Sequence, residues 1–215
     1  MKCFARWEKD DVAGIFFRDQ TILQFGDKWD LRASFILLNP GSALPKNDKN
    51  QTNYLCLKNL PFFVEPQDNE KYVEFCIDRL MLDILKLFSS QFDGGTIRLY
   101  NLFNLKNQNS GEAVKQFEEN KHHPKMFAKN SEMRFCDAPV IVASGSKAYK
   151  EDLKNELIRH IKLADQNHLY KLSKTADHQF SFLKATPDNT GFIDSYHPSH
   201  TFKYGNGTEI GELQT

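Results

Sequence analysis

The 215-residue sequence predicts an α/β protein, and two observations carry that prediction. Short apolar runs, such as 35–38 and 139–143, end at Asn, Gly or Ser, which is typical of buried parallel strands. Amphipathic helical segments lie between these runs, and strands that alternate with helices favour one α/β domain with a mainly parallel sheet. We therefore expect a single domain over 1–215, with N-terminal strands in 1–30, a core in 33–203 and a flexible tail in 205–215.

The N-terminal part predicts short strands followed by a long loop. Residues 13–17 and 21–25 are apolar, and Arg-Asp-Gln at 18–20 predicts the turn of a β-hairpin between them. The apolar run 35–38 predicts a buried strand. Residues 43–69 are polar and contain three prolines, which predicts a loop.

The middle of the chain contains the clearest helical pattern. Apolar residues recur at helical spacing over 70–88 and predict one amphipathic helix there. Gly94 and Gly95 end that unit, and 97–100 predicts the next strand. Residues 107–135 predict a loop with one or two helices.

The C-terminal part alternates strands and helices. Residues 139–143 predict a strand, 147–163 an amphipathic helix and 168–172 a fourth strand of the core. The runs 180–183 and 192–194 predict a hairpin before the C-terminal histidines.

Composition excludes several classes of protein. The formal net charge is zero, which disfavours a protein that coats nucleic acid through a basic face. No run of about 18 apolar residues and no secretory signal is present, so we expect a cytoplasmic protein without a membrane span. The four cysteines form no Cys-x-x-Cys pair, and His122-His123 lacks regularly spaced ligand partners, so we expect neither a disulfide framework nor a metal. The sequence also lacks a phosphate-binding P-loop, a dinucleotide fingerprint and a nucleophile elbow.

Polar residues follow three of the expected strands, where an open α/β sheet binds its ligands. In Leu-Asn-Pro-Gly-Ser at 38–42, the Asn39 amide can hold a water or a polar ligand edge, and Gly41 permits close approach to the backbone. The alternative is a plain turn, because Asn, Pro and Gly are ordinary turn residues. Asn101 offers one acceptor and two donors in a plane, which matches the edge of a nucleobase; the alternative is an Asn that caps a loop.

Two further loops carry candidate ligand groups. Pro198 restrains His197 to extended geometry, and Ser199 can bind a phosphate, although a surface loop with two histidines is the alternative. His200 is bulky enough to wedge into a nucleic-acid stack. Ser-Gly-Ser at 144–146 precedes an expected helix and predicts an anion site, or a simple N-cap by Ser146.

Taken together, these segments resemble the uracil-DNA glycosylase superfamily. Residues 35–43 are similar to its first motif, in the Asn-Pro-Gly form of the mismatch-specific uracil/thymine branch. Residues 97–105 are similar to the strand whose terminal Asn reads uracil, and 139–149 to the strand, Gly-Ser and helix that follow. His-Pro-Ser at 197–199 matches the last motif. The segment around Leu-Asn-Pro also resembles an uncharacterised bacterial Leu-Asn-Pro-Ser family.

The resemblance implies a three-layer α/β/α fold with a central four-stranded, mainly parallel sheet, to which the N-terminal hairpin is added. It implies a monofunctional DNA glycosylase that hydrolyses the N-glycosidic bond of a flipped-out pyrimidine and leaves an abasic site. Such an enzyme needs no metal or cofactor. Its partner is DNA, and we expect a monomer.

The resemblance also assigns roles to residues. Asn39 positions the attacking water, and His197 donates a hydrogen bond to the oxygen where negative charge grows. Asn101 reads the base, Gly41 leaves its pocket wide, and Tyr54 stacks on it. Contacts to phosphate or DNA fall to a set of polar residues: Ser42, Ser146, Ser199, His200 and Lys203.

Two departures from the family bear on the substrate. Gly41 stands where uracil-specific members carry a bulky Tyr, and residues 174–193 form an insertion before His197. Both favour a mismatched thymine or a modified pyrimidine, including a bulky hydroxymethyl or glycosyl base of phage DNA, which would make the protein a defence enzyme. Two alternatives stay open: a catalytically inactive nucleic-acid-binding module of the same fold, and an N-glycosidase that acts on free nucleotides.

Overall fold

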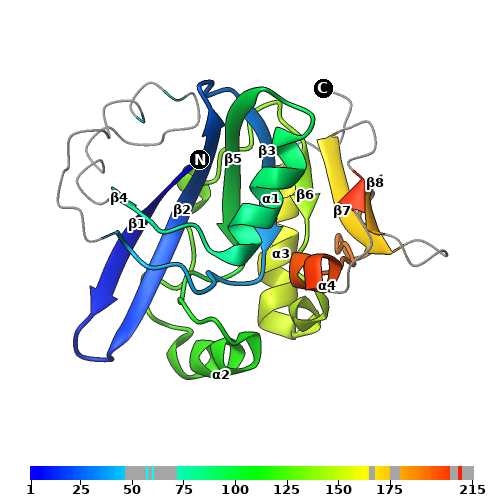
Figure 1. Cartoon of the computed structure of the whole chain (residues 1–215). Coiled ribbons are helices and arrows are strands. Elements are labelled where there is room, and N and C mark those ends of the chain that lie inside the picture. The colour runs from blue at the N-terminus through cyan, green and yellow to red at the C-terminus, as the bar shows by residue number, and fades with distance from the viewer. Residues whose placement is uncertain are drawn as a thin grey trace.

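A computed structural model describes residues 1–46, 57, 60, 72–164, 168–174, 180–203 and 208–209, without the side chains of 201–203, 208 and 209. Within these residues one mixed sheet contains nine strands in the order β4-β1-β2-β5-β3-β6-β7-β8-β9. The strands are β1 Lys2–Asp10, β2 Ile15–Gly26, β3 Leu31–Leu37, β4 Tyr72–Glu74, β5 Gly94–Asn101, β6 Val140–Val142, β7 Leu169–Lys174, β8 Phe180–Lys184 and β9 Thr208–Glu209 (Figure 1). The helices are α1 Arg79–Ser89, α2 Ser110–Asn120, α3 Glu151–Leu163 and α4 Pro198–Lys203, with 3-10 turns η3 Asn130–Glu132 and η4 Ser146–Tyr149.

The α/β class expected from the sequence is confirmed, but the sheet is larger than the expected four strands. The neighbours β5, β3, β6 and β7 pair in parallel. The antiparallel strand β2 extends this block on the β5 side, and the antiparallel strand β8 extends it on the β7 side. Because β3, β5 and β6 run in the same direction, their carboxyl ends meet at one edge of the sheet. Figure 1 shows α2 and α4 at this end of the molecule.

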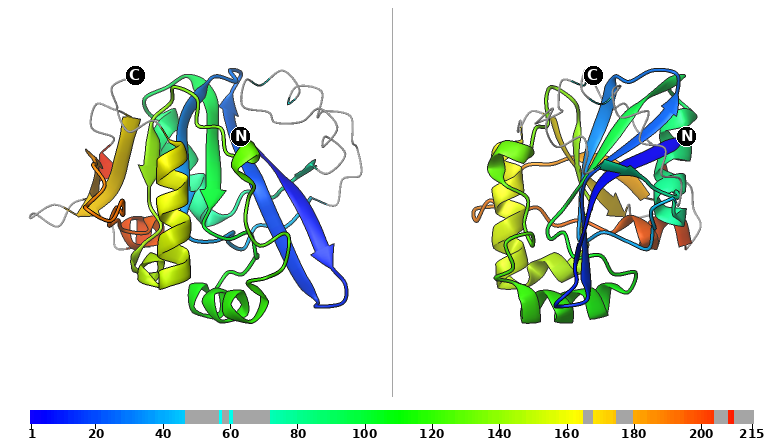
Figure 2. Two further views of the ribbon diagram at one scale, coloured as in Figure 1. Left: turned by 180° about the vertical axis from the view of Figure 1, so that it is seen from behind. Right: turned by 90° about the vertical axis from the view of Figure 1, so that its left-hand side faces the viewer.

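Helices cover both faces of the sheet, with α1 on one side and α3 on the other (Figure 2). The face of α1 that carries Met81, Ile84 and Phe88 packs on alternate residues of the central strands. Leu157 and Ile161 of α3 pack on the opposite face. Each helix therefore buries one apolar stripe, which is why its apolar residues recur at the helical period of 3.6 residues.

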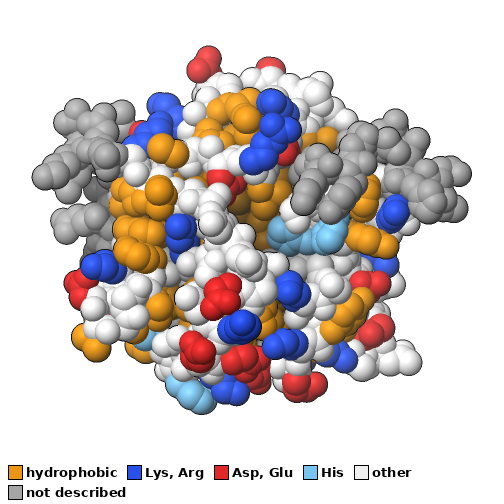
Figure 3. Space-filling view, turned by 60° about the horizontal axis from the view of Figure 1, so that its bottom comes forward, with side chains coloured by type: hydrophobic (Ala, Val, Ile, Leu, Met, Phe, Trp, Pro, Cys, Tyr) orange, Lys and Arg blue, Asp and Glu red, His pale blue; other side chains and the backbone are white. Residues whose placement is uncertain are grey.

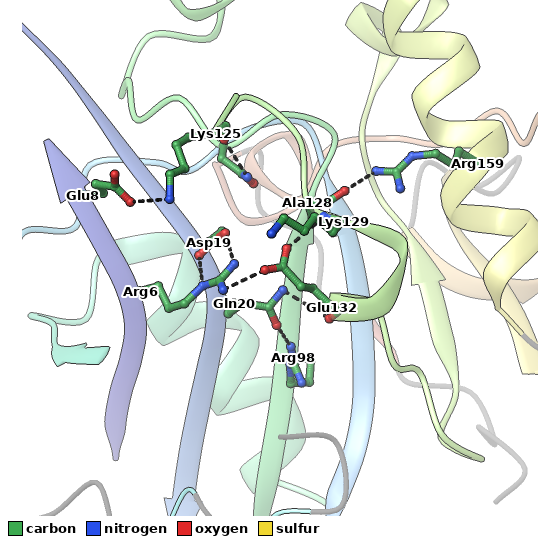
Figure 4. Close-up of polar contacts among 11 residues, drawn as sticks. Arg6, Glu8, Asp19, Gln20, Arg98, Lys125, Ala128, Lys129, Glu132 and Arg159 are labelled. Atoms are coloured by element: carbon green, nitrogen blue, oxygen red, sulfur yellow. Dashed lines mark hydrogen bonds and ion pairs between the residues drawn. The ribbon is translucent and has the colours of Figure 1, made fainter. Parts of the chain in front are cut away.

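The N-terminal hairpin lies elsewhere than predicted. β1 and β2 pair from Lys2↔Gln24 to Asp10↔Ile15, so the turn is at 11–14 and the polar residues at 18–20 lie inside a strand. Asp19 and Gln20 tolerate the strand because they are paired: Arg6 binds both Asp19 and Glu132, and Gln20 binds Arg98 (Figure 4). A bulge in the register between Phe4 and Arg6 accompanies this polar cluster.

The expected helix over 70–88 begins only at Arg79. The Asp78 side chain accepts a hydrogen bond from the Met81 N–H at 3.0 Å and caps the helix at its N-terminus. Residues 72–74 instead form β4, which pairs with β1. Four residues separate the strand from the helix, and the apolar positions of the two elements continue one helical spacing by coincidence.

Two predictions near the C-terminus are also wrong. Residues 192–194 form no strand, and β8 pairs with β7 instead. The Asp188 carboxylate accepts hydrogen bonds from the N–H groups of Thr190 and Phe192, and this holds the segment as a loop. The helix expected over 147–163 is divided into η4 and α3. Of the helices in the described ranges, none is long and apolar enough to cross a membrane.

Candidate functional site

A cavity of about 660 Å³ lies at the edge of the sheet where β3, β5 and β6 end. Its wall comes from the loops that follow these three strands, from the first turns of α1 and from the segment that contains His197. The volume is within the range of sites that bind small molecules. Figure 3 looks onto this end of the molecule, where histidine side chains lie near the centre of the face.

Asn39 has its amide fixed by the backbone. Its Nδ2 donates to the carbonyl oxygens of Pro40 and Asn107, both at 2.8 Å. Both amide hydrogens are thereby used, and among the described residues no group donates to its Oδ1. Since Asn39 lines the cavity, this oxygen is an oriented acceptor for a water or a ligand donor.

His197 has Nδ1 hydrogen-bonded, and its Nε2 has no partner among the described residues. Its Nδ1 accepts from the Ser199 N–H at 3.2 Å and lies 2.8 Å from the Ser199 hydroxyl. The pKa of His197 is lowered to about 4, mainly because burial disfavours the charged ring and to a lesser extent because of the charge of His200. The ring is therefore neutral near pH 7, its proton is on Nε2, and this nitrogen is a hydrogen-bond donor.

The loop after β6 and the segment before His197 are joined. The Ser144 N–H donates to Ser195 Oγ at 3.1 Å, and both residues are buried. The Ser144 hydroxyl is itself buried, lines the cavity and has no partner within the described part of the chain. A buried hydroxyl without a partner is costly, so this group is available to a ligand.

Asp78 is a residue of the site that sequence reasoning missed. Besides capping α1, it accepts from the Ala43 N–H through Oδ2 at 3.3 Å, and it lines the cavity. A Cβ at Gly41 would lie 3.0 Å from the same oxygen, so the glycine leaves this carboxylate open to the cavity. The signal in the sequence is an Asp directly before an apolar helical run, but that pattern indicates a cap and not a ligand.

Asn101 does not line the main cavity. It is 5% exposed and lines a smaller recess, of about 10 Å³, which shares Asn39, Gly41, Asp78 and Leu80 with the main cavity. Its side chain has no hydrogen-bond partner among the described residues. The structure therefore places Asn101 behind the loop of Asn39, next to the cavity.

The recess also contains two residues of β2 that the sequence had placed in or beside a turn. Arg18 and Thr21 line it together with Asn101. Thr21 pairs with Leu99 in the β2–β5 ladder, and so the N-terminal hairpin supplies part of the site. Because the sequence predicts a turn at 18–20, it does not predict that the hairpin contributes to the site.

The predicted phosphate-binding residues lie at the rim. Ser42, Ser146, Ser199 and His200 are exposed and line the cavity, as does Lys147. The expected helix N-terminus is wrong, because η4 follows Gly145 and α3 begins only at Glu151. The anion site therefore loses the helix dipole and retains only side chains and a short turn.

Two predicted residues fall outside the described part of the chain: Tyr54, and the side chain of Lys203. Of the cysteines, Cys3, Cys76 and Cys136 are free thiols, and Cys56 lies outside the described residues. No group of three or more potential metal ligands occurs in the described residues. His123 instead bonds Asp10 at 3.0 Å and stacks on Phe17.

Comparison with known proteins adds no neighbour: the chain matches no protein-family model, no curated protein and no solved structure.

Proposed function

We propose that the protein is a monofunctional DNA glycosylase that hydrolyses the N-glycosidic bond of a flipped-out mismatched or modified pyrimidine. One observation carries the proposal: an oriented acceptor, Asn39 Oδ1, and a neutral imidazole donor, His197, line one cavity at the carboxyl edge of the parallel strands. The order of these residues along the chain agrees with the resemblance to the uracil-DNA glycosylase superfamily. The parallel block β5-β3-β6-β7 with helices on both faces agrees with the fold that the resemblance implies.

The proposed reaction passes through a cation-like sugar and a departing base anion. Asn39 Oδ1 accepts a hydrogen from the attacking water and orients its lone pair toward the sugar carbon. An amide cannot take up the proton, so Asn39 positions the water and does not act as a strong base. The two carbonyl oxygens that hold Asn39 Nδ2 fix which atom of the amide faces the water.

His197 stabilises the leaving base. Its Nε2–H donates to the carbonyl oxygen at ring position 2, where negative charge grows as the bond breaks. Because the ring is neutral, it forms this hydrogen bond without transferring a proton, and the departing base anion takes up, through solvent, the proton that the attacking water loses. Loss of one such donor costs about 3 kcal/mol, or about a hundredfold in rate.

Asp78 supplies the negative charge that Asn39 lacks. Its carboxylate lines the same cavity, and it is held by two backbone N–H groups in a fixed orientation. A carboxylate in that place favours the positive charge that develops on the sugar. The exposed serines and Lys147 at the rim would contact the DNA backbone.

The test is a strand-cleavage assay. Labelled duplexes that contain uracil, a G·T mismatch, or hydroxymethylated or glucosylated cytosine are incubated with the protein and treated with alkali, which breaks the strand at abasic sites. Asn39→Ala and His197→Ala should each lower cleavage by about a hundredfold or more. The matched controls are Asn155→Ala and His122→Ala, whose residues are exposed and lie outside the cavity.

The assay separates the proposal from its alternatives. Cleavage that is lost in both site variants and retained in both controls supports the glycosylase. Binding of duplex without cleavage contradicts it and favours a binding module. Release of base from free nucleotides, with intact duplexes left uncut, contradicts it and favours a nucleotide N-glycosidase.

A further inference from the structure

The Asn39 amide depends on the loop after β5 for its direction. The carbonyl oxygen of Asn107, in that loop, accepts from Asn39 Nδ2 at 2.8 Å, and the Asn107 N–H donates to the Pro40 carbonyl oxygen at 3.2 Å. The other acceptor of Asn39 Nδ2 is Pro40, the next residue in the chain. Asn107 therefore supplies the contact from a distant part of the sequence that sets which way the amide points.

The side chain of Asn107 in turn fastens this loop to α2. Its Oδ1 accepts from the N–H of Asn109 at 2.8 Å, which forms a local turn. Its Nδ2 donates to Gln116 Oε1 at 2.9 Å, in the second turn of α2. Of these two bonds, only the one to Gln116 joins the loop to a regular element of the fold.

The helix is a firm support for that bond. Asn109 caps α2 by accepting from two N–H groups of its first turn. Phe117, the residue after Gln116, is fully buried, and its ring packs on that of Phe103 in the core. Because α2 is anchored in this way, Gln116 presents its oxygen to the Asn107 loop from a fixed position.

Gln116 itself lies away from the reacting groups. It lines neither the cavity nor the recess, whereas Asn107 and Asn39 both line the cavity. A residue that touches neither the attacking water nor the base can influence the reaction only through the groups that it holds. From Gln116 these groups lead in two hydrogen-bonded steps to the Asn39 amide.

We propose that Gln116 is a positioning residue: through the Asn107 loop it fixes the direction in which Asn39 Oδ1 faces the attacking water. The inference rests on the proposed function and adds to it a residue outside the cavity. Without the Gln116 oxygen, the Asn107 side chain loses its bond to α2, and the carbonyl that orients Asn39 is free to shift. The bond from the Asn107 N–H to Pro40 remains, so the Asn39 amide is loosened and not released.

Two substitutions separate the hydrogen bond from the bulk of the side chain. Gln116→Met removes the acceptor and keeps the length, and we expect it to lower the rate of single-turnover cleavage at saturating protein by about three- to tenfold. Gln116→Glu should recover most of that rate, because a carboxylate oxygen accepts from Asn107 Nδ2 as the amide oxygen does. Glu119→Met is the matched control, since Glu119 is exposed on the same helix and lines neither space. It should cut at the wild-type rate.

A double-mutant cycle shows whether Gln116 acts through Asn39. Asn39→Ala protein has no amide left to orient, so adding Gln116→Met should change its residual rate by less than about twofold. An equal fall in both backgrounds overturns the proposal. An unchanged rate in Gln116→Met, or a rate in Gln116→Glu as low as in Gln116→Met, also overturns it and leaves the glycosylase standing.

The orientation of Asn39 can also be measured without cleavage. Its two side-chain amide protons give NMR signals that Asn39→Ala identifies by their loss, and both protons are hydrogen-bonded, so they should exchange slowly with solvent. We expect Gln116→Met to speed this exchange at least about threefold and Glu119→Met to leave it unchanged. If no duplex is cut, the glycosylase is overturned and the exchange rate decides the inference. Faster exchange in Gln116→Met supports the positioning role, and unchanged exchange overturns it.

Discussion

Gly145 and His197 lie in direct contact at the edge of the cavity. A Cβ built at Gly145 would come within 2.8 Å of His197 Cβ, and the glycine has a φ of +75°. The loop after β6 can therefore approach the C-terminal histidine only because this residue has no side chain. The contact fixes where His197 stands relative to the loop of Ser144 and Ser146.

Gly145→Ala should displace His197 from the cavity. The added methyl forces the two loops apart and also strains a positive φ, at a cost of about 1–2 kcal/mol in stability. We expect cleavage to fall by at least about tenfold, because a small displacement of a catalytic donor is costly. Gly191→Ala is the matched control, since Gly191 has a φ of +83° but its nearest neighbour to a Cβ is 3.5 Å away. Equal loss of cleavage in both variants would show that strain, and not the contact, is responsible.

Asn39→Asp should be harmful, although an acid is the better general base. Both oxygens of Asp are acceptors, so one of them would face the carbonyl oxygens of Pro40 and Asn107 where Nδ2 now donates at 2.8 Å. We expect a loss of about 2–4 kcal/mol in the free energy of unfolding, measured in urea, and lower cleavage at pH 7. A variant that is as stable as the wild type and cuts faster would contradict the assigned orientation of the amide.

Asp78→Asn tests the carboxylate separately from the helix cap. Asn keeps one oxygen to cap the helix at the Met81 N–H, but its NH2 group then faces the Ala43 N–H, so we expect a loss of about 1 kcal/mol in the free energy of unfolding. If Asp78 opposes the positive charge on the sugar, kcat should fall by about ten- to a hundredfold. The measurement is single-turnover cleavage together with urea unfolding. An unchanged rate would leave Asp78 with a structural role only.

Periodicity alone predicts the parallel core well, because its strands and helices are local patterns. The apolar runs at 35–38, 97–100 and 139–143 overlap β3, β5 and β6, respectively. The errors occur where partners far apart in sequence decide the outcome. The sequence of residues 18–20 is typical of a turn. In the fold, Arg6 pairs with Asp19 and Glu132, and Arg98 pairs with Gln20, so distant partners hold these residues in a strand.

In the candidate site, too, the residues that follow local patterns could be predicted and those that depend on distant contacts could not. Asn39 and His197 could be predicted because each follows a recognisable local pattern, and the structure brings both to one cavity. Asp78, Arg18 and Thr21 could not, because only the tertiary fold brings β2 and the start of α1 against the Asn39 loop. For Asn101 the local pattern predicts the end of a strand correctly, but it does not predict that the side chain lies in the recess behind the Asn39 loop and not in the main cavity.

The pH profile of cleavage should have its acidic limb near pH 4. Burial lowers the pKa of His197 to about 4, whereas an unperturbed imidazole titrates near 6.5. Protonation adds a hydrogen at Nδ1, where the Ser199 N–H now donates, and this breaks the local arrangement. We therefore expect a rate that is flat from about pH 8 to pH 5 and falls below that. A midpoint near 6.5 would contradict a neutral His197 whose pKa is lowered by partial burial.

Acid should destabilise the fold through His160, which is fully buried on the inner side of α3. Its Nδ1 lies 2.9 Å from the Glu156 carbonyl oxygen, and its Nε2 has no partner among the described residues. Burial lowers the pKa of His160 to about 4. Because the unfolded chain binds this proton near pH 6.5 and the folded chain only near pH 4, stability is complete above 6.5 and declines as the pH falls toward 4.

The decline attributable to His160 amounts to roughly 3 kcal/mol between those two pH values. His160→Met removes the titrating group and keeps an apolar side chain of similar length, so the variant should lose less stability on acidification than the wild type does. Urea unfolding at pH 7.5 and pH 4.5 measures the difference for each protein. His122→Ala, which removes an exposed histidine after α2, should leave the wild-type difference unchanged. If His160→Met loses as much stability on acidification as the wild type, the buried imidazole is not the cause, and other groups that bind protons on unfolding must account for the loss.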